Sequence, residues 1–343
     1  MPKRNNSDIH KLFFFLPKSR RKQVAGIILL TFIAAIAEMA SIGAIVPFIA
    51  IISDPEATMR NEYVLVLASY FNVSTQREMI FIIASIFSVA AIFAGLIRYA
   101  LLWYQTKFSF GVGGDVSREI YKLTLQQDYK VHLARNSSDI ISAITVKVRD
   151  VVNLIIGPWI NLVSSLFLLI AIASFLFFVD PYVALMAFSM FGSLYAVIAV
   201  VVKNRLVRHG EIKTKNQSLI VKSLQEGLGG IRDVIIDRMQ PAFLKKFVRH
   251  DMPARSSDVS IIVISQAPRY LVEAFGLVMI ACMSYILLFV FQRPGNILAT
   301  LGALGLGAQR MLPLLQQTYW SYSQIHGGKT SLKDVVKLLE QDD

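Results

Sequence analysis

Long apolar runs separated by basic segments form the main pattern of this chain. A helix needs about 20 residues to cross a bilayer. Lipid offers the backbone no hydrogen-bond partner, so a span must satisfy its own polar groups as a helix. The pattern therefore predicts an all-α membrane protein with six transmembrane helices, at residues 24–52, 79–104, 154–179, 182–202, 267–291 and 297–316.

Lysine and arginine residues lie in alternate connections between the predicted spans. The segments before the first span, between the second and third, between the fourth and fifth, and after the sixth hold 29 of them, whereas the other connections hold three. Basic connections stay on the cytoplasmic side, so both termini are predicted to be cytoplasmic. This orientation accounts for the net charge of +12, and no nucleic-acid partner is expected.

The two long cytoplasmic connections, 105–153 and 203–266, have the pattern of helices rather than linkers. They contain few prolines and place apolar residues at helical spacing among charged ones. The simplest structure extends the spans into the cytoplasm and turns each pair at its tip. The chain then divides into an amphipathic elbow segment at 1–23, a six-span domain at 24–320 and a cytoplasmic helix at 321–343.

Six spans, two long cytoplasmic hairpins and short outer turns together resemble the transmembrane domain of a type I ABC exporter. Short motifs within the spans are similar to one branch of that family, the flippases of lipid-linked oligosaccharides. These motifs are Glu38 followed by Pro47-Phe48, Pro268-Arg269 followed by Glu273, and Arg310 followed by Pro313. The resemblance covers nearly the whole chain.

This resemblance implies a homodimer in the bacterial inner membrane that works with ABC ATP-binding domains. The expected cargo is a polyprenyl-diphosphate-linked saccharide or a similar anionic lipid. The resemblance also implies that the two cytoplasmic tips couple the spans to the ATPase. The tip residues are Tyr129, His132 and Arg135 in the first hairpin, and Arg238 and Phe243 in the second.

No phosphate-binding loop of the form G-x-x-x-x-G-K-[ST] occurs in the chain. Gly328-Lys329-Thr330 imitates its end, but Ser323 stands where the first glycine is needed, and the glycine-rich stretch 110–115 has the wrong spacing. The chain is therefore expected to bind no cofactor and to have no enzymatic activity, with ATP-Mg on a partner or missing domain. We expect a fragment, or a half-transporter whose ATPase is encoded separately. The single cysteine, Cys282, excludes an intramolecular disulfide and a multi-thiolate metal site.

Three arginines, Arg98, Arg269 and Arg310, lie within the apolar spans. Charge in a membrane is costly, so such residues usually face a cavity or a partner. Counted from the outer boundary, all three fall in the cytoplasmic half, where an arginine fork would suit a lipid diphosphate. The alternative is that they reach to the inner headgroups, and Arg269 can also pair with Glu273 one turn away.

Glu38 lies in the middle of the first span, where an unpaired carboxylate would be expensive. It is expected either to be protonated or to pair with a basic residue of another span. Pro47 and Pro313 remove backbone donors inside the first and sixth spans and are expected to kink them.

Two other functions remain open from the sequence. The same domain could export another cargo, such as a peptide, a drug or a different lipid, or it could serve as a regulatory or scaffold membrane protein without a motor. The outer connections are too small for the acidic or basic clusters of a membrane glycosyltransferase.

The charge bias makes the topology testable. Cysteines introduced at Asp180 and Asn296 should react with an impermeant reagent from outside the cell, whereas a cysteine at Lys215 should react only after permeabilisation. The opposite labelling would overturn the predicted orientation.

Overall fold

The computed structural model of the chain describes residues 11–12, 17–53, 66, 69–71, 75–134, 137–179, 181–289 and 297–341. Every secondary-structure element in this part is helical, which confirms the predicted all-α fold. The elements are α2 (Lys18–Ser53), α5 (Gln76–Gln126), α6 (Tyr129–Ala134), α7 (Ser137–Ser142), the π-helical turn η1 (Ala143–Lys147), α8 (Val148–Val151), the π-helical turn η2 (Val152–Ile156), α9 (Gly157–Val179), α10 (Pro181–Gly229), α11 (Ile231–Ile236), α12 (Gln240–Phe289) and α13 (Ile297–Leu339).

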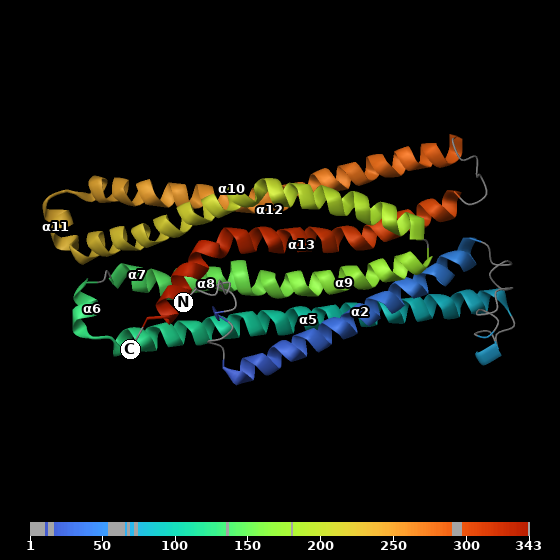
Figure 1. Cartoon of the computed structure of the whole chain (residues 1–343), viewed down its shortest axis with the longest axis horizontal. Helices are drawn as coiled ribbons and strands as arrows, with labels where there is room; N and C mark the ends of the chain where they lie inside the picture. Colours follow the sequence, from blue (N-terminus) through green and yellow to red (C-terminus); the bar gives the residue numbers. More distant parts are fainter. Residues whose placement is uncertain are drawn as a thin grey trace, which may run out of the picture.

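The long helices run along the axis of an elongated bundle (Figure 1). Helices α5, α10, α12 and α13 contain 51, 49, 50 and 43 residues. At about 1.5 Å per residue, each is far longer than the roughly 30 Å hydrocarbon core of a bilayer. The helices therefore extend well beyond the membrane, as the sequence predicts for the two hairpins.

The short helices α6 and α11 lie at the same end of the bundle (Figure 1), where α6 follows α5 and α11 joins α10 to α12. The start of α2 and the end of α13 lie in the half nearer to this tip end, while α2 ends and α5 begins at the opposite end. Both described chain ends and both hairpin tips are thus in one half of the molecule, the arrangement expected when they share one side of a membrane.

By length and hydropathy, the described residues contain four stretches that could cross a membrane: Ser19–Ser41, Gln76–Gln126, Ser137–Ser174 and Gln240–Val278. They correspond to the predicted first, second, third and fifth spans. The predicted spans at 182–202 and 297–316 lie on α10 and α13 and include side chains outside the described part.

The buried apolar side chains form two main clusters, and α13 contributes to both. The larger cluster joins α2, α5, the segment from α8 to α9, and the C-terminal part of α13. The second contains Phe191 and Tyr195 of α10, Val272 of α12 and Tyr319 of α13. Helix α13 therefore packs between the α2–α5–α9 group and the α10–α12 hairpin, as its position in Figure 1 also shows.

Glycines allow α13 to approach its neighbours closely. A Cβ atom on Gly210 of α10 would lie 2.1 Å from the carbonyl oxygen of Gly327 in α13, so only glycine fits there. A Cβ atom on Gly328 would lie 2.7 Å from Cβ of Leu154. The glycines that imitate a phosphate-binding loop in the sequence are thus packing residues of a continuous helix.

The glycine-rich stretch at 110–115 has the same explanation. It lies inside α5, where a Cβ atom on Gly113 would come within 2.4 Å of Val152 in η2. A Cβ atom on Gly111 would meet the guanidinium of Arg20, which pairs with Asp115 at 2.7 Å and so ties α2 to α5.

A charge cluster joins α8, α10 and α12 beyond the predicted spans, on the side of the hairpin tips. Lys213 of α10 pairs with Asp150 of α8 at 3.2 Å and with Asp258 of α12 at 2.9 Å. Burial disfavours its charged form, but the two carboxylates outweigh this and raise the pKa of Lys213 above its ordinary value. A second pair, Lys147 with Asp334 at 2.6 Å, connects η1 to α13.

The close approach of α10 and α13 yields a stability prediction. Gly210→Ala should lower the free energy of unfolding by about 2 kcal/mol, because the added methyl meets backbone rather than a movable side chain. Gly192→Ala is the matched control, since it lies on the same helix with nothing within 4 Å of the added atom. Thermal unfolding followed by tryptophan fluorescence should show a lower midpoint for Gly210→Ala alone. Equal midpoints would contradict the close packing.

Candidate functional site

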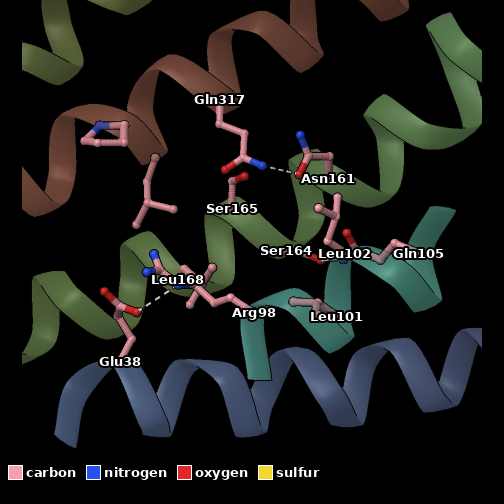
Figure 2. A pocket seen from close by; sticks show the side chains of 12 residues that line it. Glu38, Arg98, Leu101, Leu102, Gln105, Asn161, Ser164, Ser165, Leu168 and Gln317 are labelled. Atoms are coloured by element: carbon pink, nitrogen blue, oxygen red, sulfur yellow. Dashed lines mark hydrogen bonds and ion pairs between the residues drawn. The ribbon is translucent and has the colours of Figure 1, made fainter. Parts of the chain in front are cut away.

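Two cavities among the described residues flank the same stretch of α13. The first, of about 230 Å³, lies between α2, α5, α9 and α13 and is shown in Figure 2. The second, of about 490 Å³, lies between α10, α12 and α13. Pro313 and Gln317 line both cavities. We call them the ion-pair cavity and the tyrosine cavity.

The ion-pair cavity is named for Arg98 of α5 and Glu38 of α2. Arg98 Nε lies 3.5 Å from Glu38 Oε2, and the two side chains point toward one another in Figure 2. The Glu38 side chain is only 4% exposed, whereas that of Arg98 is 52% exposed. Of the two alternatives that the sequence leaves for Glu38, the geometry favours pairing, which offsets the cost of burying the carboxylate.

Neutral polar side chains continue this cavity across α9. Gln317 of α13 donates a hydrogen bond to Asn161, and Gln105 of α5 donates to Ser164 at 2.7 Å. Ser165 is buried, and its hydroxyl has no hydrogen-bond partner among the described residues. The sequence analysis did not select these residues. Asn161, Ser164 and Ser165 follow helical spacing inside an apolar span, which is the signal of a polar stripe.

The tyrosine cavity contains the second intramembrane arginine. Arg269 Nε lies 2.8 Å from Oε1 of Glu273 on the same helix, which is the pairing that the one-turn spacing allows. Gln316 of α13 donates to the same carboxylate oxygen at 3.1 Å. The Arg269 side chain is 60% exposed. One carboxylate therefore holds both the arginine of α12 and an amide of α13.

Aromatic side chains form part of the wall of the tyrosine cavity. The rings of Tyr195 and Tyr319 lie 5.5 Å apart between centroids, and Tyr270 and Trp320 also line the cavity. The Tyr319 hydroxyl donates to the carbonyl of Ile264 at 2.9 Å. The Tyr195 hydroxyl is buried without a hydrogen-bond partner in the described part of the chain. Sequence reasoning missed these rings, since aromatics in apolar spans are usually core residues.

The structure does not bring the predicted headgroup arginines into one cavity of the chain. Arg98 and Arg269 line different cavities that are separated by α13. Arg310 belongs to α13 one turn before Pro313, but its side chain lies outside the described residues. Pro47 and Pro313 lie inside the continuous helices α2 and α13.

The predicted coupling residues lie at the two tips. Tyr129 begins α6 and is 75% exposed, and Arg238 follows α11 with a φ of 53°, a left-handed conformation that is uncommon outside glycine. Phe243 is half-buried, because its ring packs against Gly227 across the hairpin. His132 is also half-buried, and Arg135 lies outside the described residues. Both tips expose apolar side chains, namely Val131, Leu133, Ile231, Ile235 and Ile236.

Nothing in the described residues groups three or more histidine, cysteine, aspartate or glutamate side chains as a metal site would. The polar groups of the two cavities are instead guanidinium, carboxylate, amide and hydroxyl groups. Such groups can bind a ligand by hydrogen bonds and charge without reacting with it.

Comparison with known protein families gives a match that agrees with this architecture. The model of the family described as ABC transporter transmembrane region matches residues 24–301 of the chain. The matched segment extends from the first predicted span into the start of α13 and includes both long hairpins.

Proposed function

The chain belongs to the ABC transporter transmembrane family, and from this premise we propose that it is the membrane-spanning part of an ATP-driven flippase for an anionic, saccharide-bearing lipid. A polyprenyl-diphosphate-linked saccharide fits this description. In this proposal two copies of the chain form the pathway, and ABC ATP-binding domains dock at the cytoplasmic tips.

The observation that carries the cargo assignment is the exposure of two arginines within predicted spans. The side chains of Arg98 and Arg269 are 52% and 60% exposed, and each lines a cavity. In both ion pairs the carboxylate contacts Nε. In the proposed complex, a second anion would bind the terminal Nη groups. Guanidinium groups suit a diphosphate because their planar fork gives paired hydrogen bonds to phosphate oxygens.

The partial neutralisation of these arginines suits transport rather than permanent binding. An arginine without a carboxylate partner would hold a diphosphate tightly and release it slowly. With Glu38 and Glu273 in place, the arginines keep a partner when the anion leaves, so the empty pathway does not bear the full cost of an unpaired charge. This support is chemical and does not identify the saccharide.

The tips support the proposed ATP-binding partner. Exposed apolar side chains on α6 and α11, among them Leu133 at 70% and Ile236 at 64%, lie on helices at the end of the bundle opposite to the end of α2 and the start of α5 (Figure 1). Apolar groups in an aqueous compartment favour a protein contact. The left-handed Arg238 would be part of that contact surface.

Arg310 provides the test of the cargo, because it lies one turn from the stretch of α13 that both cavities share. Lysine keeps the charge but lacks the fork, so Arg310→Lys should slow flipping of a diphosphate lipid by about tenfold, the loss of one charge-assisted hydrogen bond. Arg98→Lys and Arg269→Lys should slow it less. The measurement is lipid flipping in proteoliposomes with the ATP-binding domain supplied.

Arg205→Lys is the matched control, since Arg205 is exposed on α10 and lines neither cavity. It should flip at the wild-type rate, and all variants should keep wild-type expression and thermal stability. If Arg310→Lys and Arg310→Ala both flip as fast as the wild type, the diphosphate is recognised elsewhere.

A further inference from the structure

We propose that the tyrosine cavity is a saccharide subsite in which the Tyr195 hydroxyl donates to a sugar oxygen. This inference rests on the proposed function and deepens it, because it assigns the sugar and the diphosphate of the cargo to different groups. Arg269 binds the diphosphate, and the aromatic and amide side chains of the same cavity bind the sugar.

The chemistry of the lining matches a sugar ring. A pyranose has an apolar C–H face, which packs on aromatic rings, and a rim of hydroxyls, which needs planar hydrogen-bonding groups. The cavity offers rings from Tyr195, Tyr270, Tyr319 and Trp320, and amides from Gln266 and Gln316. Its volume of about 490 Å³ falls in the usual range of about 300–1,000 Å³ for small-ligand sites.

Tyr195 supplies an independent observation. The residue is only 6% exposed, and its hydroxyl has no hydrogen-bond partner among the described residues. A buried hydroxyl without a partner is destabilising, and such groups are rare unless something satisfies them. The hydroxyl belongs to a residue that lines the cavity, so a ligand oxygen there would satisfy it.

Tyr319 provides an internal comparison, because it lines the same cavity and packs against Tyr195. Its hydroxyl already donates to the Ile264 carbonyl at 2.9 Å and thereby links α13 to α12. One tyrosine hydroxyl is thus bound within the protein, and the other has no partner among the described residues. The two residues should respond in opposite ways to loss of the hydroxyl.

The neighbouring charges place the anion beside the sugar. Arg269 lines the cavity, and Glu273, held by Arg269 and by Gln316, keeps the guanidinium at its edge. A diphosphate on Arg269 would therefore have its attached sugar next to the rings. A lipid diphosphate without a sugar would use only the arginine.

The test is a binding measurement on the whole chain in lipid nanodiscs. The chain has three tryptophans, and replacing Trp103 and Trp159 by phenylalanine leaves Trp320, which lines the cavity, as the reporter. The probes are a short-chain polyprenyl diphosphate and the same lipid bearing one N-acetylglucosamine. The parent protein should bind the sugar-bearing lipid about tenfold more tightly, as one well-made hydrogen bond and ring contact allow.

Tyr195→Phe should abolish this preference and leave binding of the bare diphosphate lipid unchanged. Its thermal midpoint should stay the same or rise, because the variant removes a buried hydroxyl without a partner. Tyr319→Phe should keep the preference and lower the thermal midpoint. A merely structural Tyr195 would give the stability pattern of Tyr319 instead.

Each contrary result has a distinct meaning. If Tyr195→Phe keeps the sugar preference, or if the parent protein binds both lipids equally, the saccharide subsite is wrong while the diphosphate assignment stands. If neither lipid binds, the proposed cargo is wrong and the subsite fails with it.

Discussion

The contact between the backbones of α10 and α13 is the constraint on which the rest of the arrangement depends. Gly210 and Gly327 approach so closely that even one added carbon on Gly210 would collide with a carbonyl oxygen. This contact places α13 against the α10–α12 hairpin. The next residue of α13, Gly328, packs closely against Leu154 and Ile155 on the other side. One helix is thereby shared by two packing groups, and the stretch around Pro313 and Gln317 has a cavity on each side. A movement of α13 would change both cavities together.

Charge pairs beyond the predicted spans also secure this arrangement. Lys213 joins α8, α10 and α12 through two aspartates, and Lys147 joins η1 to α13. Because the folded-state pKa of Lys213 is raised, its contribution to stability is complete at neutral pH and is lost only as the pH rises through that raised value. The pairs in the cavities differ from this cluster, since Arg98 and Arg269 are more than half exposed. The cations of the first cluster are buried between helices, whereas the guanidinium groups in the cavities are exposed.

The sequence predicts the features that depend on local pattern. Apolar runs and basic connections give the helical spans and the hairpins, and the one-turn spacing of Arg269 and Glu273 gives their contact. The sequence cannot predict which residues meet across helices, because this depends on the rotation and approach of each helix. It therefore groups Arg98 with Arg269, which the structure places in separate cavities, and it overlooks Tyr195, Tyr319 and the polar stripe of α9. The glycines that resemble a phosphate loop in the sequence are packing residues, and only the position of the neighbouring helix shows this.

A pathway for an anionic headgroup requires that the ion-pair cavity and the tyrosine cavity contain water rather than lipid, and cysteine reactivity tests this requirement directly. On a background with Cys282 replaced by serine, cysteines replace Leu102 and Tyr270, exposed residues that line the two cavities without removing a charge. Phe93 and Leu277 are the matched positions on the same helices, 61% and 71% exposed and outside both cavities. In nanodiscs, a charged methanethiosulfonate should modify the cavity cysteines about tenfold or more faster than the controls, because only a hydrated thiol ionises readily. Equally slow modification at all four positions would show that these cavities are filled by lipid and would contradict the account.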